Sequence, residues 1–587
     1  MKKDIWPILA LISILLAGLP LQWYVIPSAA AVAGPTLSVD VTADRHPISP
    51  DIYGMNAYSM DPKDTEKLLS ELRIPVRRWG GNHTTRYNWR VDASNSGDDW
   101  FFTGGNGQAN PTPGATVDTL LDTNRTAGTQ SLITIPMIDH VQKTSAWSCG
   151  FSVAKYGQQQ AVNPYVGNGD CGNGRKPDGS ILTGNDPLDV STANSTQLQQ
   201  DWIRHLVSRH GSSTQGGVRF YALDNEPSGW SNTHRDLRLQ APTYQEIRDK
   251  TYQYAPAIKA IDPGAKIFGP VDFGWAVYVG DPAKTDGMWY APWYLKQMKQ
   301  YEQQNGKRIL DYFTENFYPS PSGVANAAAN NAGSAEVQAA RLRSTRSLWD
   351  PTYKEENWIG QWYPPIQLIR TFHKWVGEQY PGTKIAITEY NWGAVNTMNG
   401  ALAQADVLGI FGREGLDLAT MWGPPKSHEA AAYSFRMYRN YDGQGSEFGD
   451  TTIRAVSSDQ AQLAIYGAQR TRDGALTLMV INKTSNNPTS TVSLSGAKVA
   501  TSAQVYRYSS AKLDGIVRQA DQPISGNTFS ATYPANSITL LVVPQAGTQP
   551  CPSPSASPSA DPTTPPINNP KRLYLPAVMN SSRADCR

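Results

Sequence analysis

Short apolar runs alternate with longer amphipathic segments through most of the chain. Eight such runs fall at 52–55, 76–79, 132–136, 218–223, 266–269, 312–314, 384–388 and 418–422. Apolar residues recur at helical spacing between several of them, at 64–72, 198–208, 244–261, 366–379 and 402–413. This alternation over about 400 residues predicts an α/β fold, a (β/α)8 TIM-like barrel with long loops. A doubly wound open sheet is the alternative, but no GxGxxG motif follows any of the runs.

The pattern changes after about residue 450, where short strand-like runs follow one another without helical segments. They fall at 463–467, 475–482, 491–494, 503–508 and 538–543. These runs predict a C-terminal β-sandwich. Residues 37–41 alternate in the same way, and we expect this N-terminal strand to join the sandwich. The expected division is 1–33 signal peptide, 34–51 N-terminal strand, 52–450 barrel, 451–545 β-sandwich, and 546–587 linker and tail.

Both ends of the chain carry segments that are separate from these domains. The N-terminus has a positive start, an apolar stretch at 8–19 and Ala-Val-Ala at 31–33, which predict signal-peptide cleavage before Gly34. An uncleaved anchor over 8–26 is the alternative, but proline and glutamine interrupt it. The Pro/Ser/Thr-rich segment from 546 to 587 predicts an extended linker and a tail. We therefore expect a secreted, extracellular protein without a membrane span, either free or retained at the cell surface through the tail.

The four cysteines agree with export. Cys149 and Cys171 lie in one Gly- and Asn-rich segment and could form a disulfide in an oxidising compartment. Cys551 and Cys586 bracket the tail and could close it. A zinc site is the competing interpretation, but neither pair has the CxxC spacing and no histidine lies at ligand spacing.

Composition narrows the class of partner. The chain has 52 Lys and Arg against 50 Asp and Glu, so its net charge of +2 gives no indication of a nucleic-acid partner. Charged residues make up 17%, below the roughly 25% of average soluble proteins. The 17 Trp, 28 Tyr and 13 Phe suit either sugar stacking or aromatic cores. We expect a monomer.

Two glutamates follow apolar runs in polar motifs. DNEP at 224–227 follows the fourth run, and TEYN at 388–391 ends the seventh. Residues just past the C-terminal ends of barrel strands face the mouth of the barrel, so Glu226 and Glu389 are expected to meet there. Glycoside cleavage requires two carboxyl groups, one protonated to serve the leaving oxygen and one ionised. The alternative is that each glutamate caps the helix after its strand.

Further motifs identify a family. Asn-Glu-Pro after the fourth strand with a strand-seven glutamate resembles the retaining (β/α)8 glycosidases. MNAY at 55–58, RWGGN at 78–82, RYNW at 86–89 and NSGDDW at 95–100 resemble glycoside hydrolase family 44, the endoglucanases and xyloglucanases, over about residues 37–545. The resemblance implies an endo-acting cellulase-type enzyme that cleaves β-1,4-glucosidic bonds in cellulose-like glucans and xyloglucan by double displacement. It implies Glu226 as acid/base, Glu389 as nucleophile and no required cofactor.

Four residues near this pair are expected to contact substrate or nucleophile. Asn225 can donate to a sugar 2-hydroxyl, and Arg78 can hold Glu389 ionised. Tyr318 can hydrogen-bond the nucleophile, and Trp422 can form the floor where the bond breaks.

Aromatic residues beyond strand ends predict a sugar-binding cleft. Trp392, three residues after Glu389, is the first candidate, together with Trp230 and His140. Further candidates, part cleft and part core, are Trp89, Trp100, Trp147, Trp275 and Trp358. Asn316 stands where the resemblance leads us to expect a histidine.

Other acids and other functions remain open at this point. Asp98, Asp99 and Asp139 are either solvated loop residues or ligands of a structural calcium, although no contiguous calcium loop is present. A xylanase, mannanase or arabinofuranosidase of the same clan is an alternative function. A non-catalytic carbohydrate-binding protein is a second alternative, against which both glutamates speak.

Overall fold

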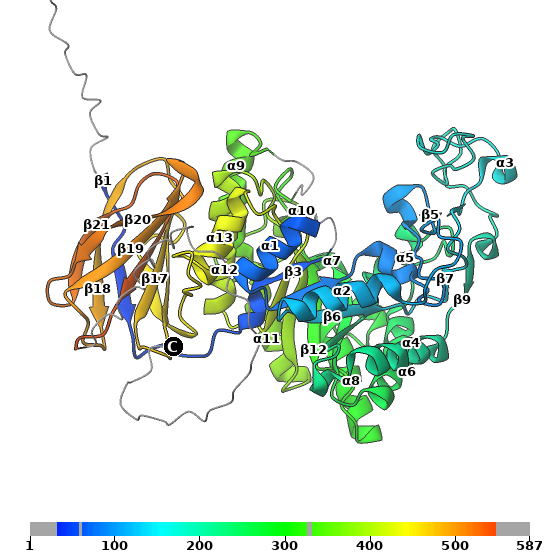
Figure 1. Ribbon diagram of the computed structural model, residues 1–587, viewed down its shortest axis with the longest axis horizontal. Helices are drawn as coiled ribbons and strands as arrows, with labels where there is room; N and C mark the ends of the chain where they lie inside the picture. Colours follow the sequence, from blue (N-terminus) through cyan, green and yellow to red (C-terminus); the bar gives the residue numbers. More distant parts are fainter. Residues whose placement is uncertain (1–31, 58–61, 326–330, 548–587) are drawn as a thin grey trace, which may run out of the picture.

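The computed structural model describes residues 32–57, 62–325 and 331–547. A closed barrel of parallel strands with surrounding helices lies beside a sheet-rich part along the long axis of the molecule (Figure 1). The predicted α/β fold of a TIM-like barrel with a C-terminal β-sandwich is confirmed. The signal peptide, apart from its last two residues, lies outside the described residues, as do Cys551, Cys586 and the tail from 548 onward.

Eight parallel strands close the barrel in the order β10-β11-β12-β13-β14-β3-β4-β6. Each lies at one of the apolar runs, although several boundaries differ by a few residues. The strands are β3 (Gly54–Asn56), β4 (Val76–Trp79), β6 (Gln130–Ile135), β10 (Phe220–Leu223), β11 (Lys266–Phe273), β12 (Tyr312–Phe317), β13 (Lys384–Tyr390) and β14 (Leu418–Met421).

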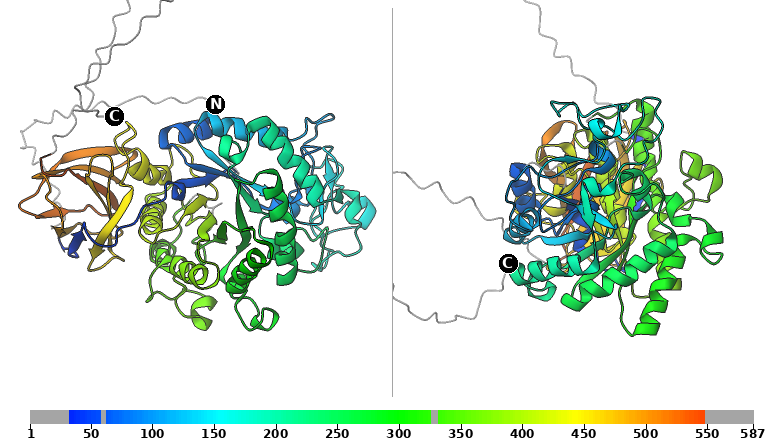
Figure 2. Two further views of the ribbon diagram at one scale, coloured as in Figure 1. Left: turned by 90° about the horizontal axis from the view of Figure 1, so that it is seen from below. Right: turned by 90° about the vertical axis from the view of Figure 1, so that its right-hand side faces the viewer.

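A long helix follows each barrel strand, and the helices ring the strands (Figure 2). They are α1 (Pro62–Leu72), α2 (Ala115–Thr126), α4 (Thr196–His210), α6 (Tyr244–Ile261), α8 (Tyr290–Asn305), α11 (Leu368–Gln379), α12 (Met398–Arg413) and α13 (Ala430–Arg439). Further helices lie in the loops: α3 (Val153–Tyr156), α5 (Trp230–Thr233), α7 (Trp275–Val279), α9 (Ala335–Ser344) and α10 (Trp358–Trp362).

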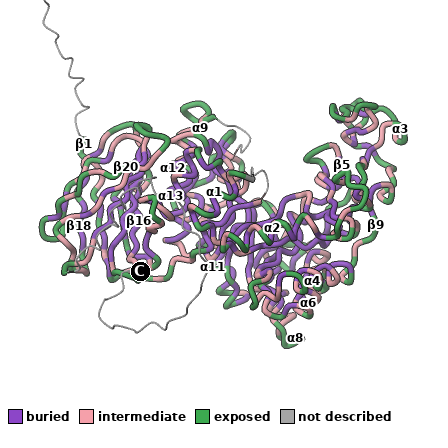
Figure 3. The backbone as a smooth tube through the Cα atoms, in the orientation of Figure 1, coloured by how far each residue is buried: buried purple, intermediate pink, exposed green. Residues whose placement is uncertain are grey.

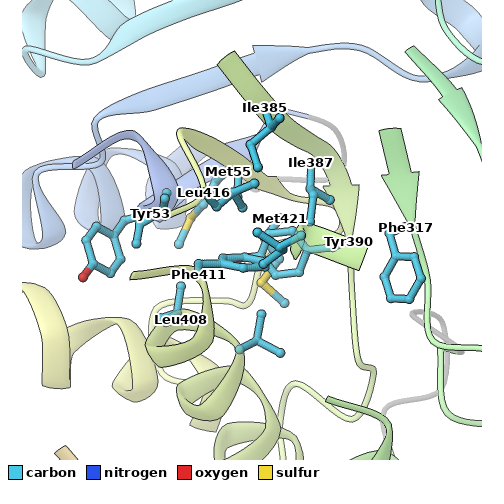
Figure 4. Packing of buried hydrophobic residues seen from close by; sticks show 14 of the residues in the cluster. Tyr53, Met55, Phe317, Ile385, Ile387, Tyr390, Leu408, Phe411, Leu416 and Met421 are labelled. Carbon is cyan, nitrogen blue, oxygen red and sulfur yellow. The ribbon is translucent and has the colours of Figure 1, made fainter. Parts of the chain in front are cut away.

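Strand β13 shows why the apolar runs form barrel strands. Ile385 and Ile387 belong to the large apolar cluster that also contains Phe411 of α12 (Figure 4). Ala386, between them, belongs to the separate cluster that fills the barrel interior. Successive side chains of a strand point to opposite faces, and here both faces are covered, so the strand is apolar throughout.

Long loops after β4 and β6 form an outlying segment on one side of the barrel mouth (Figure 1). It contains two small sheets, β5 (Thr103–Gly104) with β8 (Ser148–Cys149), and β7 (His140–Gln142) with β9 (Ser191–Ala193). The predicted disulfide between Cys149 and Cys171 is present there. Much of the chain around α3 is exposed, whereas the barrel strands are buried (Figure 3).

The sandwich is built from the C-terminal strands and two N-terminal ones. Its order is β1-β18-β2-β15-β16-β17-β22-β19-β20, with β21 paired to β18. The predicted N-terminal strand, β2, lies between β15 and β18. The bounds are β1 (Val32–Ala33), β2 (Leu37–Asp40), β15 (Thr451–Ser457), β16 (Leu463–Gln469), β17 (Leu476–Asn482), β18 (Pro488–Ser495), β19 (Ser502–Ser509), β20 (Lys512–Pro523), β21 (Thr528–Thr532) and β22 (Ser537–Val543).

Helix α12 joins the barrel to the sandwich and is buried along nearly its whole length. Its Asp406 accepts hydrogen bonds from Tyr466 at 2.6 Å and Lys483 at 2.9 Å, both from the sandwich. A Cβ at Gly409 would lie 2.3 Å from the Tyr466 ring, so only glycine permits this approach. Within the described ranges, no helix has both the length and the apolar character needed to cross a membrane.

Candidate active site

Both glutamates lie at the C-terminal ends of barrel strands. Glu226 comes three residues after the end of β10, and Glu389 is the last but one residue of β13. The side chain of Glu389 is buried, and that of Glu226 is partly buried. Two residues of other strands link the glutamates. Arg78 of β4 hydrogen-bonds Glu389 and also Asn225, the neighbour of Glu226. Asn316 of β12 hydrogen-bonds Glu226 and also Thr388, the neighbour of Glu389.

Arg78 is the centre of this network. Its fully buried guanidinium donates to Glu389 Oε1 at 2.7 Å and to Asn56 Oδ1 at 3.0 Å. A second nitrogen donates to Asn225 Oδ1 at 2.6 Å. A buried cation at hydrogen-bonding distance favours the ionised form of a carboxyl group. The contact that the sequence led us to expect between Arg78 and Glu389 is therefore present.

Two glycines after Arg78 make room for this arrangement. A Cβ at Gly80 would lie 2.3 Å from the guanidinium carbon of Arg78. Gly81 has a φ of +99°, and a Cβ there would lie 2.5 Å from the ring of Trp422. The motif RWGGN thus places an arginine, a tight turn and the partly buried ring of Trp422 next to one another.

Asn225 ties the turn before Glu226 to the RWGGN segment. Its Oδ1 accepts from Arg78 and from the backbone N–H of Gly81 at 3.2 Å. Its Nδ2 donates to Asn82 Oδ1 at 3.1 Å. These bonds fix which end of the amide points to which partner, and the amide has a second N–H group besides the one given to Asn82.

Tyr318 holds the other oxygen of Glu389. Its hydroxyl donates to Glu389 Oε2 at 2.9 Å. Burial and the nearby charge of Glu389 hold the pKa of the Tyr318 phenol well above its usual value, so the hydroxyl keeps its proton and stays a donor. Both Glu389 oxygens therefore accept a hydrogen bond.

Asn316 contacts Glu226, a role that the sequence did not reveal. Its Nδ2 donates to Glu226 Oε1 at 2.9 Å, while its Oδ1 accepts from Thr388 Oγ1 at 2.9 Å. A signal was available in the alternation of β12, because Tyr312 and Asn316 are an even number of residues apart and share the inner face. Asparagine does not titrate, so this donor remains in place at every pH at which the protein is folded.

The two carboxyl groups have opposite surroundings. Burial, followed by the charges of Glu389 and Asp272, raises the pKa of Glu226 above its ordinary value. The hydrogen bond from Asn316 and the charge of Arg78 oppose this shift without cancelling it. Glu226 is thus the carboxyl group that keeps its proton, while Glu389 faces a cation and a phenol.

Asp224 shapes the turn that carries Glu226. It is fully buried and accepts from the hydroxyl of Thr85 at 2.5 Å, from the backbone N–H of Ile138 at 3.1 Å and from that of Asn225 at 2.7 Å. Burial raises the pKa of Asp224 to about 6 despite these bonds. Both Asp224 and Glu226 have positive φ angles, +66° and +47°, so the turn is held in a conformation that such residues rarely adopt.

Comparison with known proteins identifies the family of the chain. Residues 93–321 match the model of glycoside hydrolase family 44. "Endoglucanase A" of Paenibacillus lautus is 33% identical over 544 residues, which are 89% of this chain and 74% of that protein. The chain belongs to glycoside hydrolase family 44. It is therefore an enzyme, a glycoside hydrolase.

Two solved structures of the family are similar along their whole length. CelM2, "a bifunctional glucanase-xylanase protein from a metagenome library", is 41% identical with a TM-score of 0.83, over 88% of this chain and 100% of the other. The family 44 xyloglucanase of Paenibacillus polymyxa is 32% identical with a TM-score of 0.73, over 88% and 100% of the two chains.

Two aromatic residues that were expected in the cleft of this family 44 enzyme are core residues instead. Trp392 is 1% exposed, and its ring N–H donates to Ser344 Oγ at 3.1 Å. Trp230 is also 1% exposed, with the Arg238 and Lys250 side chains over its ring. The expectation was wrong because a position past a strand end does not decide whether the side chain faces the mouth or the surrounding helices.

His140 also lies away from the network around Arg78. It begins β7, and its backbone pairs with Ala193 of β9 in the outlying segment. Among the described residues, the side chains of Glu226 and Glu389 accept hydrogen bonds from Arg78, Asn316 and Tyr318. No hydrogen bond joins His140 to either glutamate within the described residues, and its place in the cleft stays a prediction.

Several other aromatic residues in the loops at the mouth are exposed. Trp362, at the end of α10, is the most exposed of the described tryptophans at 78% and was missed in the sequence. Among the further candidates, Trp275 is buried and Trp89 is half-buried. The exposed ones are Trp100, Trp147 and Trp358.

The acids considered as calcium ligands pair with other groups. Asp98 forms an ion pair with Arg235, and Asp139 forms one with Lys250. Asp99 accepts from Asn82 Nδ2 at 3.0 Å. Within the ranges that the structure describes, no three or more His, Cys, Asp or Glu side chains gather where they could hold a metal ion.

Proposed function

We propose that this enzyme is a retaining endo-glucanase that cleaves β-1,4-glucosidic bonds in cellulose-like glucans and xyloglucan. The observation that carries the proposal is the contrast between the two carboxyl groups. Glu389 accepts from Arg78 and Tyr318, whereas burial and a like charge raise the pKa of Glu226. Ionised nucleophile and protonated acid are the pair that double displacement needs.

In the first step, Glu389 attacks the anomeric carbon while Glu226 gives its proton to the departing glycosidic oxygen. A covalent glycosyl-enzyme forms and the chain beyond the cleaved bond leaves. In the second step, the Glu226 carboxylate takes a proton from water, whose oxygen attacks the same carbon and releases Glu389. Two inversions retain the configuration of the anomeric carbon.

The neighbouring side chains support these steps. Asn225 has one N–H group beyond the one given to Asn82, and it can donate to the sugar 2-hydroxyl, a bond that strengthens in the transition state. The partly buried Trp422 ring lies against the RWGGN turn and offers a floor for the sugar. The exposed tryptophans of the mouth loops suit several sugars in a row, which favours internal cleavage of a polymer.

The names of the similar proteins support the substrate class. They are described as an endoglucanase, a xyloglucanase and a bifunctional glucanase-xylanase. Xylan is therefore a second candidate substrate for the same site. We also propose that the enzyme is secreted, since the N-terminal pattern predicts a signal peptide and the disulfide in the outlying segment suits an oxidising compartment.

A panel of polysaccharides tests the proposal. Carboxymethyl-cellulose, xyloglucan, lichenan, xylan and mannan are digested, and the first product anomer is followed by NMR. We expect a rapid fall in the viscosity of the glucans and β-anomers as first products. First products in the α configuration, or no activity on any glucan, would contradict it. Assaying culture medium and cells separately tests secretion.

Replacing Tyr318 by phenylalanine is expected to lower kcat on glucans. The hydrogen bond to Glu389 is lost, and such bonds to charged groups contribute about 1.5–3 kcal/mol, or roughly ten- to a hundredfold in rate. Tyr252→Phe is the matched control, because that hydroxyl donates to a backbone carbonyl in the helical layer. Equal kcat values for the two variants would remove Tyr318 from the mechanism.

A further inference from the structure

The turn that carries Glu226 rests on an irregular part of β11. The register between β11 and β12 shifts between Pro270 and Asp272, and Val271 has a φ of +60°. Positive φ in a β-branched residue is rare and costs conformational energy, so surrounding contacts must hold it. One such contact is direct, since the backbone N–H of Glu226 donates to Val271 O at 2.8 Å.

Asp272, the next residue, binds the same turn from the other side. Its carboxyl group is fully buried and accepts from Ser228 Oγ at 2.6 Å and from the backbone N–H of Ser228 at 3.2 Å. Ser228 is two residues after Glu226. Val271 therefore binds the backbone of Glu226, and Asp272 binds Ser228 two residues later. Glu226 itself has a φ of +47°.

Resting on the proposed role of Glu226, we propose that Asp272 is a positioning residue for this acid/base. Its buried carboxylate holds the turn that presents Glu226, and its negative charge helps the Glu226 carboxyl group to keep its proton.

Within the described structure, no cation is among the groups that act on the charge of Asp272. Opposite it in register lies Glu315 of β12, a fully buried side chain whose oxygens have no hydrogen-bond partner among the described residues. Burial holds the pKa of Glu315 well above its usual value, so this carboxyl group is neutral. The other titratable groups that interact with Asp272 are phenols of α7 and α8, which are also neutral: Tyr278, Tyr290 and Tyr294.

The sign of the effect on Glu226 follows from these charges. Burial raises the pKa of Asp272 to about 7, so its negative charge develops as the pH rises through neutrality. That charge, like that of Glu389, raises the pKa of Glu226, whereas Arg78 and the Asn316 hydrogen bond lower it. Asp272 thus keeps Glu226 protonated up to a higher pH, so its effect is expected in the alkaline limb of the pH–activity profile.

Asp272→Asn removes the charge and keeps the shape. The asparagine Oδ1 can still accept from Ser228. We expect the alkaline limb of kcat/KM on xyloglucan to move to lower pH by about one unit, a common size for shifts caused by a neighbouring charge. On an aryl glycoside whose leaving group needs no proton, that limb is expected to stay in place.

Two matched variants separate charge from shape. Glu315→Gln replaces a neutral acid by a neutral amide and is expected to leave the alkaline limb where it is in the wild type. Ser228→Ala removes the hydroxyl that donates to Asp272, which raises the pKa of Asp272 but leaves a group that still ionises, so its shift is expected to be smaller than that of Asp272→Asn. An unmoved limb in Asp272→Asn, or an equal shift in Ser228→Ala, would overturn the inference.

Two further measurements keep the outcome unambiguous. If Asp272→Asn does not give folded protein by circular dichroism, Asp272→Ser also removes the charge and carries the same expected shift. Glu226→Gln is measured in parallel on xyloglucan. Wild-type rates in that variant would refute the proposed function itself, whereas a strong loss there with an unmoved limb in Asp272→Asn refutes only the role of Asp272.

Discussion

Replacing Glu389 by alanine is expected to reduce the hydrolysis of glucans by a factor on the order of 10^6, as the removal of a catalytic nucleophile does in other enzymes. No other carboxylate is held by Arg78 and Tyr318, so within the described structure no side chain there can form the glycosyl-enzyme. The space left by the side chain admits a small anion. With an activated aryl glycoside, azide should restore part of the rate and give a glycosyl azide of inverted configuration.

The control for this experiment is a glutamate outside the mouth. Glu302 of α8 pairs with Arg308 and accepts from Tyr380, so Glu302→Ala should leave the rate unchanged. Glu389→Ala also leaves the buried Arg78 without its counter-charge, which costs about 3–5 kcal/mol of stability when a buried pair is broken. Folding is therefore checked by circular dichroism, with Glu389→Gln as a milder variant. Wild-type activity in both Glu389 variants would refute the assignment.

The barrel could be predicted because its strands are buried on both faces and read as continuous apolar runs. Ile385, Ala386 and Ile387 of β13 are an example, since helices cover one face and the barrel interior the other. Strand β20 was missed for the opposite reason. It lies at the end of the strand order and exposes Leu513 and Val517, so no face of it is buried enough to produce an alternating pattern.

The positions of the two glutamates could also be predicted, because the end of a barrel strand is defined by the chain itself. The direction of a side chain beyond a strand end is decided by packing. Trp392 turns into the core beside Ser344, whereas Trp362 remains exposed on α10, and nothing in the local sequence separates the two.

Buried acids were the main part of the site that sequence reasoning missed. Charged residues are mostly exposed in proteins, so Asp224 and Asp272 give no indication of burial by their type. Each is buried because it satisfies hydrogen-bond donors from other parts of the chain, Thr85 and Ile138 for Asp224 and Ser228 for Asp272. Such pairings join segments far apart in the chain and appear only when the fold is known.

The second large effect is expected from Glu226→Gln. Glutamine keeps the shape and can still accept from Asn316 Nδ2, but it has no proton to give to the leaving oxygen. General acid catalysis contributes about 10²–10⁴-fold, and we expect a loss of this size on xyloglucan. An aryl glycoside with a good leaving group needs no proton, so its first step should keep nearly the wild-type rate.

The same variant also loses the base that activates water in the second step. With the aryl substrate, the glycosyl-enzyme on Glu389 should therefore accumulate. The expected signal is a burst of released phenol followed by slow turnover. Azide needs no base, so it should accelerate the slow phase and give a glycosyl azide of retained configuration, opposite to the product of Glu389→Ala. Because the two variants differ in the configuration of the azide product, an exchange of these outcomes would show that the roles of the two glutamates are reversed.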